Sequence, residues 1–435
     1  MRPARWIRCL LLTILLGGAA SHAAPPDKSE RVMASFIGSE QHNAIDLLEQ
    51  AVNINSGTLN FEGVRAVAKL FAPRFAALGF NTRWEEGGTF RRAGHLIAER
   101  PGRGKHLVLI GHLDTVFEPD SPFQRFERID NERVRGPGVA DMKGGIVVAL
   151  TALAALNKVD ALRNLHITVV LHGDEEDAGE PLDLARGTLI QAAKDADIAL
   201  GLENAADDPA TMVTARRSSS SWRLQVEGTT AHSSRIFSPE VGAGAVYEMA
   251  RILNGFYEQL HEQEYLTFNP GLTAAGAQLE FVPEPLQARV SGKDNIVPAR
   301  AVVSGDLRSL SLQQREQAKQ TMLAIAARNL PQTRAVLEFQ DSYPPMAPTE
   351  GNRRLLQMYD AVSRDLGFGT VTELNPSRAG AADISFAADH VEMALDGLGL
   401  LGGGAHTPAE FADLRTFQVQ SQRLAVLLYR LSRSR

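Results

Sequence analysis

The stretch HLVLIGHLDTV, residues 106–116, decides the fold class that this sequence predicts. A short apolar run opens the stretch, and a polar turn with two ionisable side chains follows it. Further apolar runs and helix-like patterns alternate along the chain, at 144–156, 165–171, 184–193, 198–202 and 393–401. Apolar strands that alternate with helices are typical of a mostly parallel sheet covered by helices on both faces. We therefore expect an α/β fold in which helices sandwich such a sheet.

The middle of the chain has a different pattern. Strand-like and helix-like segments follow one another there at 221–226, 241–260, 276–282, 299–307, 312–329 and 335–340. The order β-α-β-β-α-β is that of a small ferredoxin-like α+β domain. We place this domain at 216–333, inserted between a first part of the α/β domain at 24–215 and a second part at 334–435.

The N-terminus has the pattern of a secretory signal peptide. Three arginines precede an apolar run at 10–16, and the small-residue sequence Ser-His-Ala follows at 21–23. The apolar run is too short to remain as a membrane anchor. The only cysteine, Cys9, lies within this leader, so the mature chain would contain no disulfide. We expect a signal peptide at 1–23 and a periplasmic or secreted protein.

The overall composition argues against two classes of partner. The chain has 435 residues, and a formal net charge of −6. This charge does not favour binding to nucleic acid or to an anionic membrane. A hydrophobic content of 44% provides ample material for a core without disulfides.

Ionisable side chains gather where the predicted strands end or where a glycine-rich turn precedes a helix. These residues are His112, Asp114, Asp141, Glu175, Glu176, Glu203 and His406. In open α/β sheets, ligand sites lie outside the carboxyl ends of the strands. Imidazole nitrogens and carboxylate oxygens are suitable ligands for zinc or a similar divalent ion. The pattern predicts a metal centre at this edge of the sheet.

Each of these motifs also has an ordinary structural interpretation. His112 and Asp114 point to the same side of an extended segment, so the carboxylate could orient a metal-bound imidazole, or both could belong to a solvated turn. Asp141 could bridge two metals or simply cap a helix. Of the adjacent Glu175 and Glu176, one could ligate a metal while the other faces a bound water. Alternatively, both could belong to a solvated acidic loop. Taken together, the residues favour a two-metal hydrolase in which a free carboxylate acts as the general base.

Five motifs carry a resemblance to a known family: GHLDTV (111–116), GPGVADMKGG (136–145), GDEED (173–177), GLENA (201–205) and GGGAHTPAE (402–410). In these motifs and their order, the chain resembles the co-catalytic zinc family of aminoacylases, succinyl-diaminopimelate desuccinylases, dipeptidases and glutamate carboxypeptidase. The resemblance implies a zinc exopeptidase-like fold and two Zn²⁺ per subunit, with Co²⁺ or Mn²⁺ as substitutes.

The resemblance also assigns roles to single residues. The implied metal ligands are His112, Asp141 and Glu203 for one ion, and Asp141, Glu176 and His406 for the other. Glu175 would be the general base, and Asp114 would orient His112. The peptide bond after Asp141 would be cis.

The inserted domain resembles the lid and dimerisation domain of the same family. VEGTTAHSS (226–234) corresponds to the segment that presents a histidine to the tetrahedral intermediate, often from the partner subunit, which makes His232 a candidate and implies a homodimer. DNIVPARAVVSGDLRS (294–309) corresponds to the stretch that binds the substrate's carboxylate, here through Asn295 and Arg308. The chain departs from the family at Arg378, which either reaches into the substrate pocket or replaces a turn, and at the triple glycine 402–404.

The function expected from these residues is an exported di-zinc metallopeptidase or amidohydrolase. Its substrates would be small peptides or N-acyl amino acids cut next to a free carboxylate, as in glutamate carboxypeptidase. An N-acyl-amino-acid deacylase or a dipeptidase with the same site is the alternative within the enzymes. An exported binding protein without activity is the alternative from another class, and the presence of Glu175 beside every expected ligand argues against it.

Overall fold

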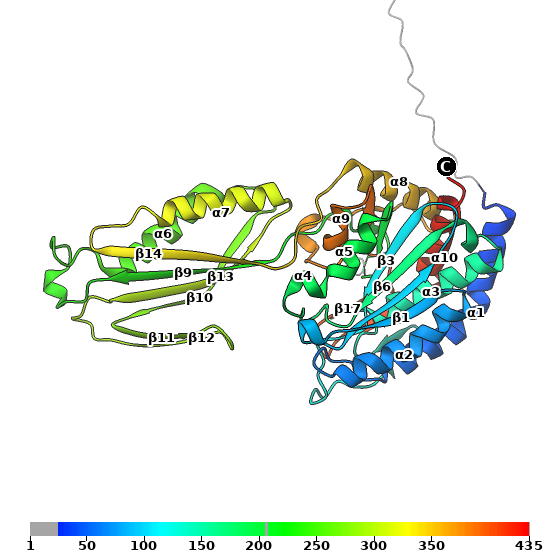
Figure 1. Cartoon of the computed structure of the whole chain (residues 1–435), viewed down its shortest axis with the longest axis horizontal. Helices are drawn as coiled ribbons and strands as arrows, with labels where there is room; N and C mark the ends of the chain where they lie inside the picture. The colour runs from blue at the N-terminus through cyan, green and yellow to red at the C-terminus, as the bar shows by residue number, and fades with distance from the viewer. Residues whose placement is uncertain (1–24, 205–207, 435) are drawn as a thin grey trace, which may run out of the picture.

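The computed structural model describes residues 25–204 and 208–434, so the predicted signal peptide lies outside the described residues. Figure 1 shows a large α/β domain and an elongated inserted domain, joined where the chain crosses between them twice. In the described ranges, no helix combines the length and the apolar character needed to cross a membrane.

A six-stranded sheet forms the centre of the α/β domain, in the order β1-β2-β6-β3-β7-β16. Its strands are β1 (Asn81–Glu86), β2 (Gly94–Arg100), β3 (His106–His112), β6 (His166–His172), β7 (Ile198–Gly201) and β16 (Met393–Leu395). The four strands from β6 to β16 are parallel, whereas β1 and β2 pair antiparallel at one edge. The prediction of a mostly parallel sheet is confirmed.

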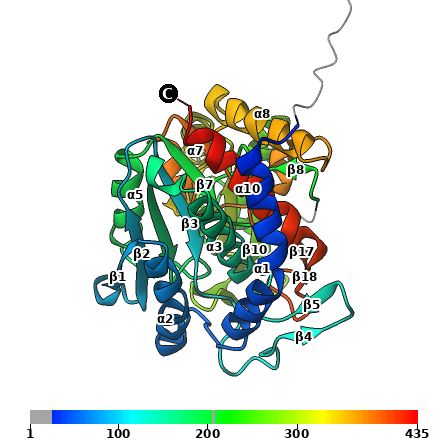
Figure 2. The ribbon, with the colours of Figure 1, turned by 90° about the vertical axis from the view of Figure 1, so that its right-hand side faces the viewer.

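Helices cover both faces of this sheet. The first face carries α1 (Lys28–Val52), α2 (Phe61–Ala77), α3 (Lys143–Lys158), α8 (Glu350–Asp365) and α10 (Arg415–Leu431). The opposite face carries α5 (Gly187–Lys194) and α9 (Ser385–Ala388). Figure 2 shows α1, α3 and α10 side by side over the sheet.

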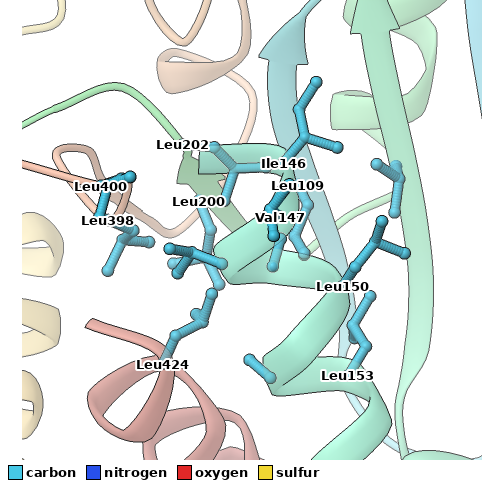
Figure 3. Close-up of a cluster of buried hydrophobic side chains, with 14 of the residues drawn as sticks. Leu109, Ile146, Val147, Leu150, Leu153, Leu200, Leu202, Leu398, Leu400 and Leu424 are labelled. Carbon is cyan, nitrogen blue, oxygen red and sulfur yellow. The ribbon is translucent and has the colours of Figure 1, made fainter. Parts of the chain in front are cut away.

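The side chains of β3 alternate between two buried clusters, which explains why a strand in this position is apolar throughout. Leu107 and Leu109 lie in the cluster on the α3 side, whereas Val108 and Ile110 lie in the cluster on the α5 side. Figure 3 shows leucines of β7, α3 and α10 packed around Leu109. Because both faces of the sheet are buried, its strands need no polar alternation.

Two elements of the α/β domain differ from the sequence-based expectation. The predicted helix 184–193 is divided into α4 (Leu182–Ala185) and α5, because Arg186 turns its side chain into a buried ion-pair network between them. The predicted strand 393–401 ends at Leu395, since the next residue, Asp396, pairs with Arg216 and caps the following backbone N–H.

The inserted domain has the predicted β-α-β-β-α-β order. Its elements are β9 (Ser220–Gly228), α6 (Gly244–Leu260), β10 (Thr267–Gly276), β13 (Arg300–Arg308), α7 (Leu312–Ala326) and β14 (Thr333–Asp341). The four strands form an antiparallel sheet in the order β10-β13-β9-β14. Both helices lie over one face, where Trp222 and Phe256 meet in the core.

Two details of this domain correct the expectation. The strand expected at 276–282 is really the end of β10 and the first arm of an additional hairpin, β11 (Gln278–Val282) and β12 (Gln287–Ser291). The sequence pattern concealed β10 because Asn269, Pro270 and Gly271 interrupt it at a bulge. The domain also extends past the expected boundary at 333, because β14 pairs with β9 as far as Asp341.

Two small sheets complete the α/β domain. β4 (Glu127–Arg128), β5 (Arg133–Arg135), β17 (Gly402–Gly403) and β18 (Phe411–Asp413) form one, in the order β17-β18-β5-β4. β8 (Thr211–Met212) and β15 (Thr372–Glu373) form a short parallel pair. The turn between β17 and β18 contains His406 and reaches the edge of the main sheet.

Candidate metal centre

The predicted ligands converge at the carboxyl ends of the parallel strands. His112 is the last residue of β3, Glu176 follows β6, and Glu203 follows β7. Asp141 lies just before α3, and His406 comes from the turn between β17 and β18. Segments that are far apart in the sequence therefore supply one cluster.

The two carboxylate oxygens of Asp141 face different histidines. Oδ1 lies 3.2 Å from Nε2 of His112, and Oδ2 lies 3.2 Å from Nε2 of His406. Nε2 of His112 is also 3.3 Å from Oε1 of Glu203, while Nε2 of His406 is 3.1 Å from Oε2 of Glu176. The cluster thus consists of two triads that have Asp141 in common.

These spacings fit a pair of divalent ions. Ligand atoms 2.0–2.1 Å from a tetrahedral ion are about 3.3 Å from one another. The separations of 3.1 to 3.3 Å within the two triads match this value. Two other groupings are also close, one of which includes Glu175: atoms of His112, Glu175 and Glu203 lie within 4.8 Å of one another, as do those of His112, Asp141 and Glu176. The donor set and its geometry therefore fit a two-metal centre.

Asp114 connects the strand ends behind the cluster. Its Oδ1 lies 3.4 Å from Nδ1 of His112, which also contacts the Asp114 carbonyl oxygen at 3.1 Å. The same carboxylate accepts the backbone N–H groups of Glu175 and Glu176, both at 3.1 Å, and the hydroxyl of Thr58 at 2.7 Å. Asp114 and His112 are both buried, and the Asp114 carboxylate lies where it can orient the His112 ring.

Glu410 holds the turn that carries Asp141. Its buried carboxylate accepts the backbone N–H groups of Gly138, Ala140 and Asp141 at 3.0–3.1 Å. The peptide bond between Asp141 and Met142 is cis, as the family resemblance implies. Glu410 was not among the predicted site residues, although it lies at the end of the GGGAHTPAE motif.

The cluster carries an excess of buried negative charge. Burial, reinforced by repulsion from Asp141, raises the pKa of Glu203 to about 7. Burial also raises the pKa of Glu175 well above its usual range, and neighbouring carboxylates add to this effect. Buried carboxylates this close together repel one another, and a divalent cation between them would offset the repulsion. The electrostatics therefore agree with a cation site.

The pKa values of the two histidines are also raised, which favours their charged forms. Burial favours the neutral form of His112, but the neighbouring carboxylates, Glu203 foremost, outweigh it and raise its pKa well above the usual value. Hydrogen bonds to Asp141 and Glu176 raise the pKa of His406 to about 11. A side chain that is 60% exposed places His406 on the solvent side of the cluster.

A cavity of about 260 Å³ opens beside the cluster. Asp141, Glu175, Glu203 and His406 lie on its metal-cluster side. Arg378 and the loop residues that follow it form another wall. The cavity gives a small molecule access to Glu175 and the cluster at once.

A buried network that the sequence did not predict supports the cluster from behind. Arg186 donates from Nε to Asp383 at 2.6 Å and from Nη1 to Asp174 at 2.8 Å. Asp383 also contacts the ring of His172, the last residue of β6. All four side chains are buried. Only the acidic run at 174–177 hinted at this network in the sequence, because the other members lie far apart in the chain.

The structure does not bring every predicted site residue to the cluster. His232 and Asn295 are neighbours, since the Ser233 N–H donates to the Asn295 carbonyl at 2.8 Å, and both are exposed. They lie beyond the outer ends of β9 and β13, respectively. Arg308 stands at the opposite end of β13, about 27 Å along an extended strand. Within one chain, Arg308 is therefore near the α/β domain, whereas His232 and Asn295 are remote from it.

Comparison with known proteins agrees with this geometry. The model of peptidase family M20/M25/M40 matches residues 108–430, which include all the predicted metal ligands. The chain belongs to this peptidase family. It is accordingly a metal-dependent peptide hydrolase with a zinc exopeptidase fold.

Individual relatives support the same assignment. The chain is similar to carboxypeptidase G2 from Pseudomonas sp. (strain RS-16), with 26% identity over 419 residues and 95% of each chain covered. Its fold is similar to that of aminopeptidase PepT from Bacillus cereus, with a TM-score of 0.71, 17% identity, and 90% of this chain and 99% of that chain covered. A dinuclear metal-binding M20 peptidase from Bacillus subtilis, YXEP, has a TM-score of 0.62 and 16% identity, with 90% and 98% covered.

Proposed function

We propose that this M20 peptidase is an exported di-zinc metallo-exopeptidase that cleaves small peptides or N-acyl amino acids next to a free carboxylate. His112, Asp141 and Glu203 would hold one ion, and Asp141, Glu176 and His406 the other. The observation that carries this proposal is the division of the two Asp141 oxygens between two histidine-containing triads. Co²⁺ and Mn²⁺ prefer similar ligands and are expected substitutes.

The protein's own residues supply positioning and proton transfer. When bound, two such ions polarise a carbonyl oxygen and make hydroxide available at neutral pH. Glu175 borders the cavity without belonging to either proposed triad, so its carboxylate can take a proton from water and give it to the leaving amine. Asp114 keeps the His112 ring oriented through Nδ1.

Substrate recognition would involve both domains. Arg308 lies at the end of β13 that faces the α/β domain, and its planar guanidinium suits bidentate binding of a carboxylate. His232 and Asn295 are exposed at the far end of the same sheet, from which they can reach the site of a second subunit. This arrangement favours a homodimer that forms through the inserted domain, with His232 as an oxyanion donor.

The direct test is the Glu175→Gln variant, assayed with a panel of dipeptides, N-acyl amino acids and folate-type compounds. We expect unchanged metal content and nearly complete loss of hydrolysis, because the ligands remain and the base is absent. Asp177→Asn is the matched control, since this neighbouring acid is 58% exposed and pairs with Arg92 outside the cluster. Retained turnover in Glu175→Gln would refute the proposed base.

The same panel separates the remaining alternatives. Preferred cleavage of N-acyl amino acids would identify a deacylase, and preferred cleavage of unblocked dipeptides would identify a dipeptidase. A metal-loaded wild-type protein that binds these compounds but hydrolyses none would be a binding protein and would contradict the proposal. Export is tested separately by locating the mature N-terminus, which we expect close to residue 24.

A further inference from the structure

Arg217 lies on the segment where the chain first crosses from the α/β domain to the inserted domain. Its Nη1 donates to the hydroxyl of Thr267, the first residue of β10, at 3.3 Å. Its Nη2 donates to the carbonyl oxygen of Ser377 in the α/β domain at 3.0 Å. One guanidinium group therefore contacts both domains at the point where they meet.

This guanidinium has no acidic partner of its own. In the described parts of the chain, its hydrogen bonds go to a hydroxyl and a carbonyl, and no carboxylate oxygen lies within 4.0 Å. Its Nε is buried and has no hydrogen-bond partner among the described residues. Burial lowers the pKa of Arg217, and the positive charge of Arg308 lowers it further. Nη1 and Nη2 each carry a second N–H group beyond the two bonds above, so the guanidinium can still bind an acceptor.

Arg308, the second cation at this junction, lies directly opposite Thr267 in the pairing of β13 with β10, and the Thr267 hydroxyl accepts from Arg217. Its Nε donates to Oδ2 of Asp306 at 2.9 Å, and the two side chains are 33% and 40% exposed. The Asp306 carboxylate pairs with Arg308 and also attracts the Arg217 guanidinium from beyond hydrogen-bond distance. Two cations with one carboxylate leave an uncompensated positive charge at the junction of the domains.

The arginine pair adjoins the cavity that contains the metal cluster. Ser377, which accepts the hydrogen bond from Arg217, directly precedes Arg378 in the cavity wall. Arg216, the residue before Arg217, lines the same cavity and donates to the Gly380 carbonyl at 2.9 Å. An anion held between Arg217 and Arg308 would thus lie beside the part of the cavity wall that Arg216 and Arg378 form.

We propose that Arg217 and Arg308 form one anion clamp across the two domains and together bind the free carboxylate of the substrate. The proposal rests on the proposed peptidase function and adds Arg217 as a specificity-determining residue. Planar guanidinium groups bind a carboxylate through paired N–H donors, and two of them can hold both of its oxygens. The clamp therefore selects peptides or N-acyl amino acids with a free carboxylate over the corresponding amides.

The test measures binding rather than turnover. The metal-loaded full chain with Glu175→Gln is titrated in a calorimeter with N-acetyl-alanyl-alanine and with its C-terminal amide. We expect the acid to bind roughly 10- to 100-fold more tightly than the amide, the range for a charged hydrogen-bond pair. Adding Arg217→Gln should reduce the affinity for the acid to that for the amide and leave the amide unchanged.

Three further variants separate a clamp from a structural role. Thr267→Val removes the contact of Arg217 with β10 but keeps the cation, and Arg223→Gln removes a charge of the same domain that pairs with Glu338. Both should keep the preference for the acid. Arg217→Lys should retain part of it, because the charge remains without the planar fork. This variant also provides the answer if Arg217→Gln does not fold.

Two outcomes would overturn the clamp. One is an Arg217→Gln variant that keeps the full preference for the acid while Arg308→Gln loses it, which would leave the carboxylate to Arg308 alone. The other is a parent protein that binds acid and amide equally. Either result leaves the hydrolysis assay of the proposed function untouched, so failure of the clamp and failure of the peptidase assignment remain distinguishable.

Discussion

The hydroxyl of Tyr343 donates to the backbone carbonyl of Glu175 at 3.0 Å, although 168 residues separate the two in the chain. The same hydroxyl accepts from Nη2 of Arg186 at 2.7 Å. Through this pair of bonds, the peptide of the proposed general base is joined to the buried ion pairs of Arg186 with Asp174 and Asp383. The position of Glu175 therefore depends on segments from three regions of the sequence.

Replacing Arg186 with Met should strongly destabilise the protein. The variant leaves Asp174 and Asp383 buried without their cation, which typically costs about 3–5 kcal/mol. Urea unfolding measures the change in the free energy of unfolding. Arg415→Met is the control, because this arginine is 62% exposed and pairs with Asp413 at the surface, where a pair contributes about 0–1 kcal/mol. Equal effects of the two substitutions would contradict the buried network.

His95 should make stability depend on pH. Burial, together with the nearby His172 and Arg186, lowers its pKa well below the usual 6.5. The folded state then binds fewer protons than the unfolded state between its own pKa and 6.5, so stability falls as the pH falls below 6.5, by up to about 1.4 kcal/mol per pH unit.

The His95→Gln variant isolates this contribution. Glutamine can still donate to the Ala185 carbonyl and accept from the Gly173 N–H, as the ring nitrogens do at 2.9 and 3.3 Å. We expect the stability advantage of the wild type over the variant to shrink between pH 7 and pH 5 in urea unfolding of EDTA-treated protein. An advantage that stays constant with pH would contradict a neutral, buried His95.

His406→Ala should remove one of the two metals. His406 belongs to a single triad, whereas Asp141 belongs to both, so Asp141→Ala should remove both ions. Mass spectrometry of the native protein or elemental analysis measures the metals per chain. The exposed His390 provides the control in His390→Ala, which should keep both. Two tightly bound ions in His406→Ala would contradict the assigned ligand set.

His232 should act on the site of the partner subunit. His232→Ala is expected to lower turnover by about 10²- to 10³-fold, the range for loss of one oxyanion donor. Mixing this variant with Glu175→Gln under conditions of subunit exchange should restore activity. A mixed dimer then contains one site with an intact Glu175 and an intact His232. No recovery in confirmed mixed dimers would show that His232 acts, if at all, within its own chain.

The sequence predicted the parts of the metal centre that follow strand ends. His112, Glu176 and Glu203 are close in space because parallel strands deliver their carboxyl ends to one edge. The apolar strand patterns that locate these ends depend on local sequence alone. His406 was expected at this edge because it follows the predicted strand 393–401, whereas the structure supplies it from the turn between β17 and β18.

The supporting residues could not be predicted in the same way. Glu410 binds backbone N–H groups of the Asp141 turn from about 270 positions away, and Tyr343 reaches Glu175 from another segment. Such contacts depend on how remote segments pack, and no local pattern encodes them. The strand β10, in contrast, was not predicted because its local sequence is misleading: Asn269, Pro270 and Gly271 are residues typical of a turn.

The central claim is that two divalent ions bind between the triads joined by Asp141. Elemental analysis of a purified, catalytically active preparation tests it most directly. The structure predicts two ions per chain, zinc or a substitute such as cobalt or manganese, with activity lost on chelation and regained on reloading. An active preparation that contains no divalent metal would contradict the assignment.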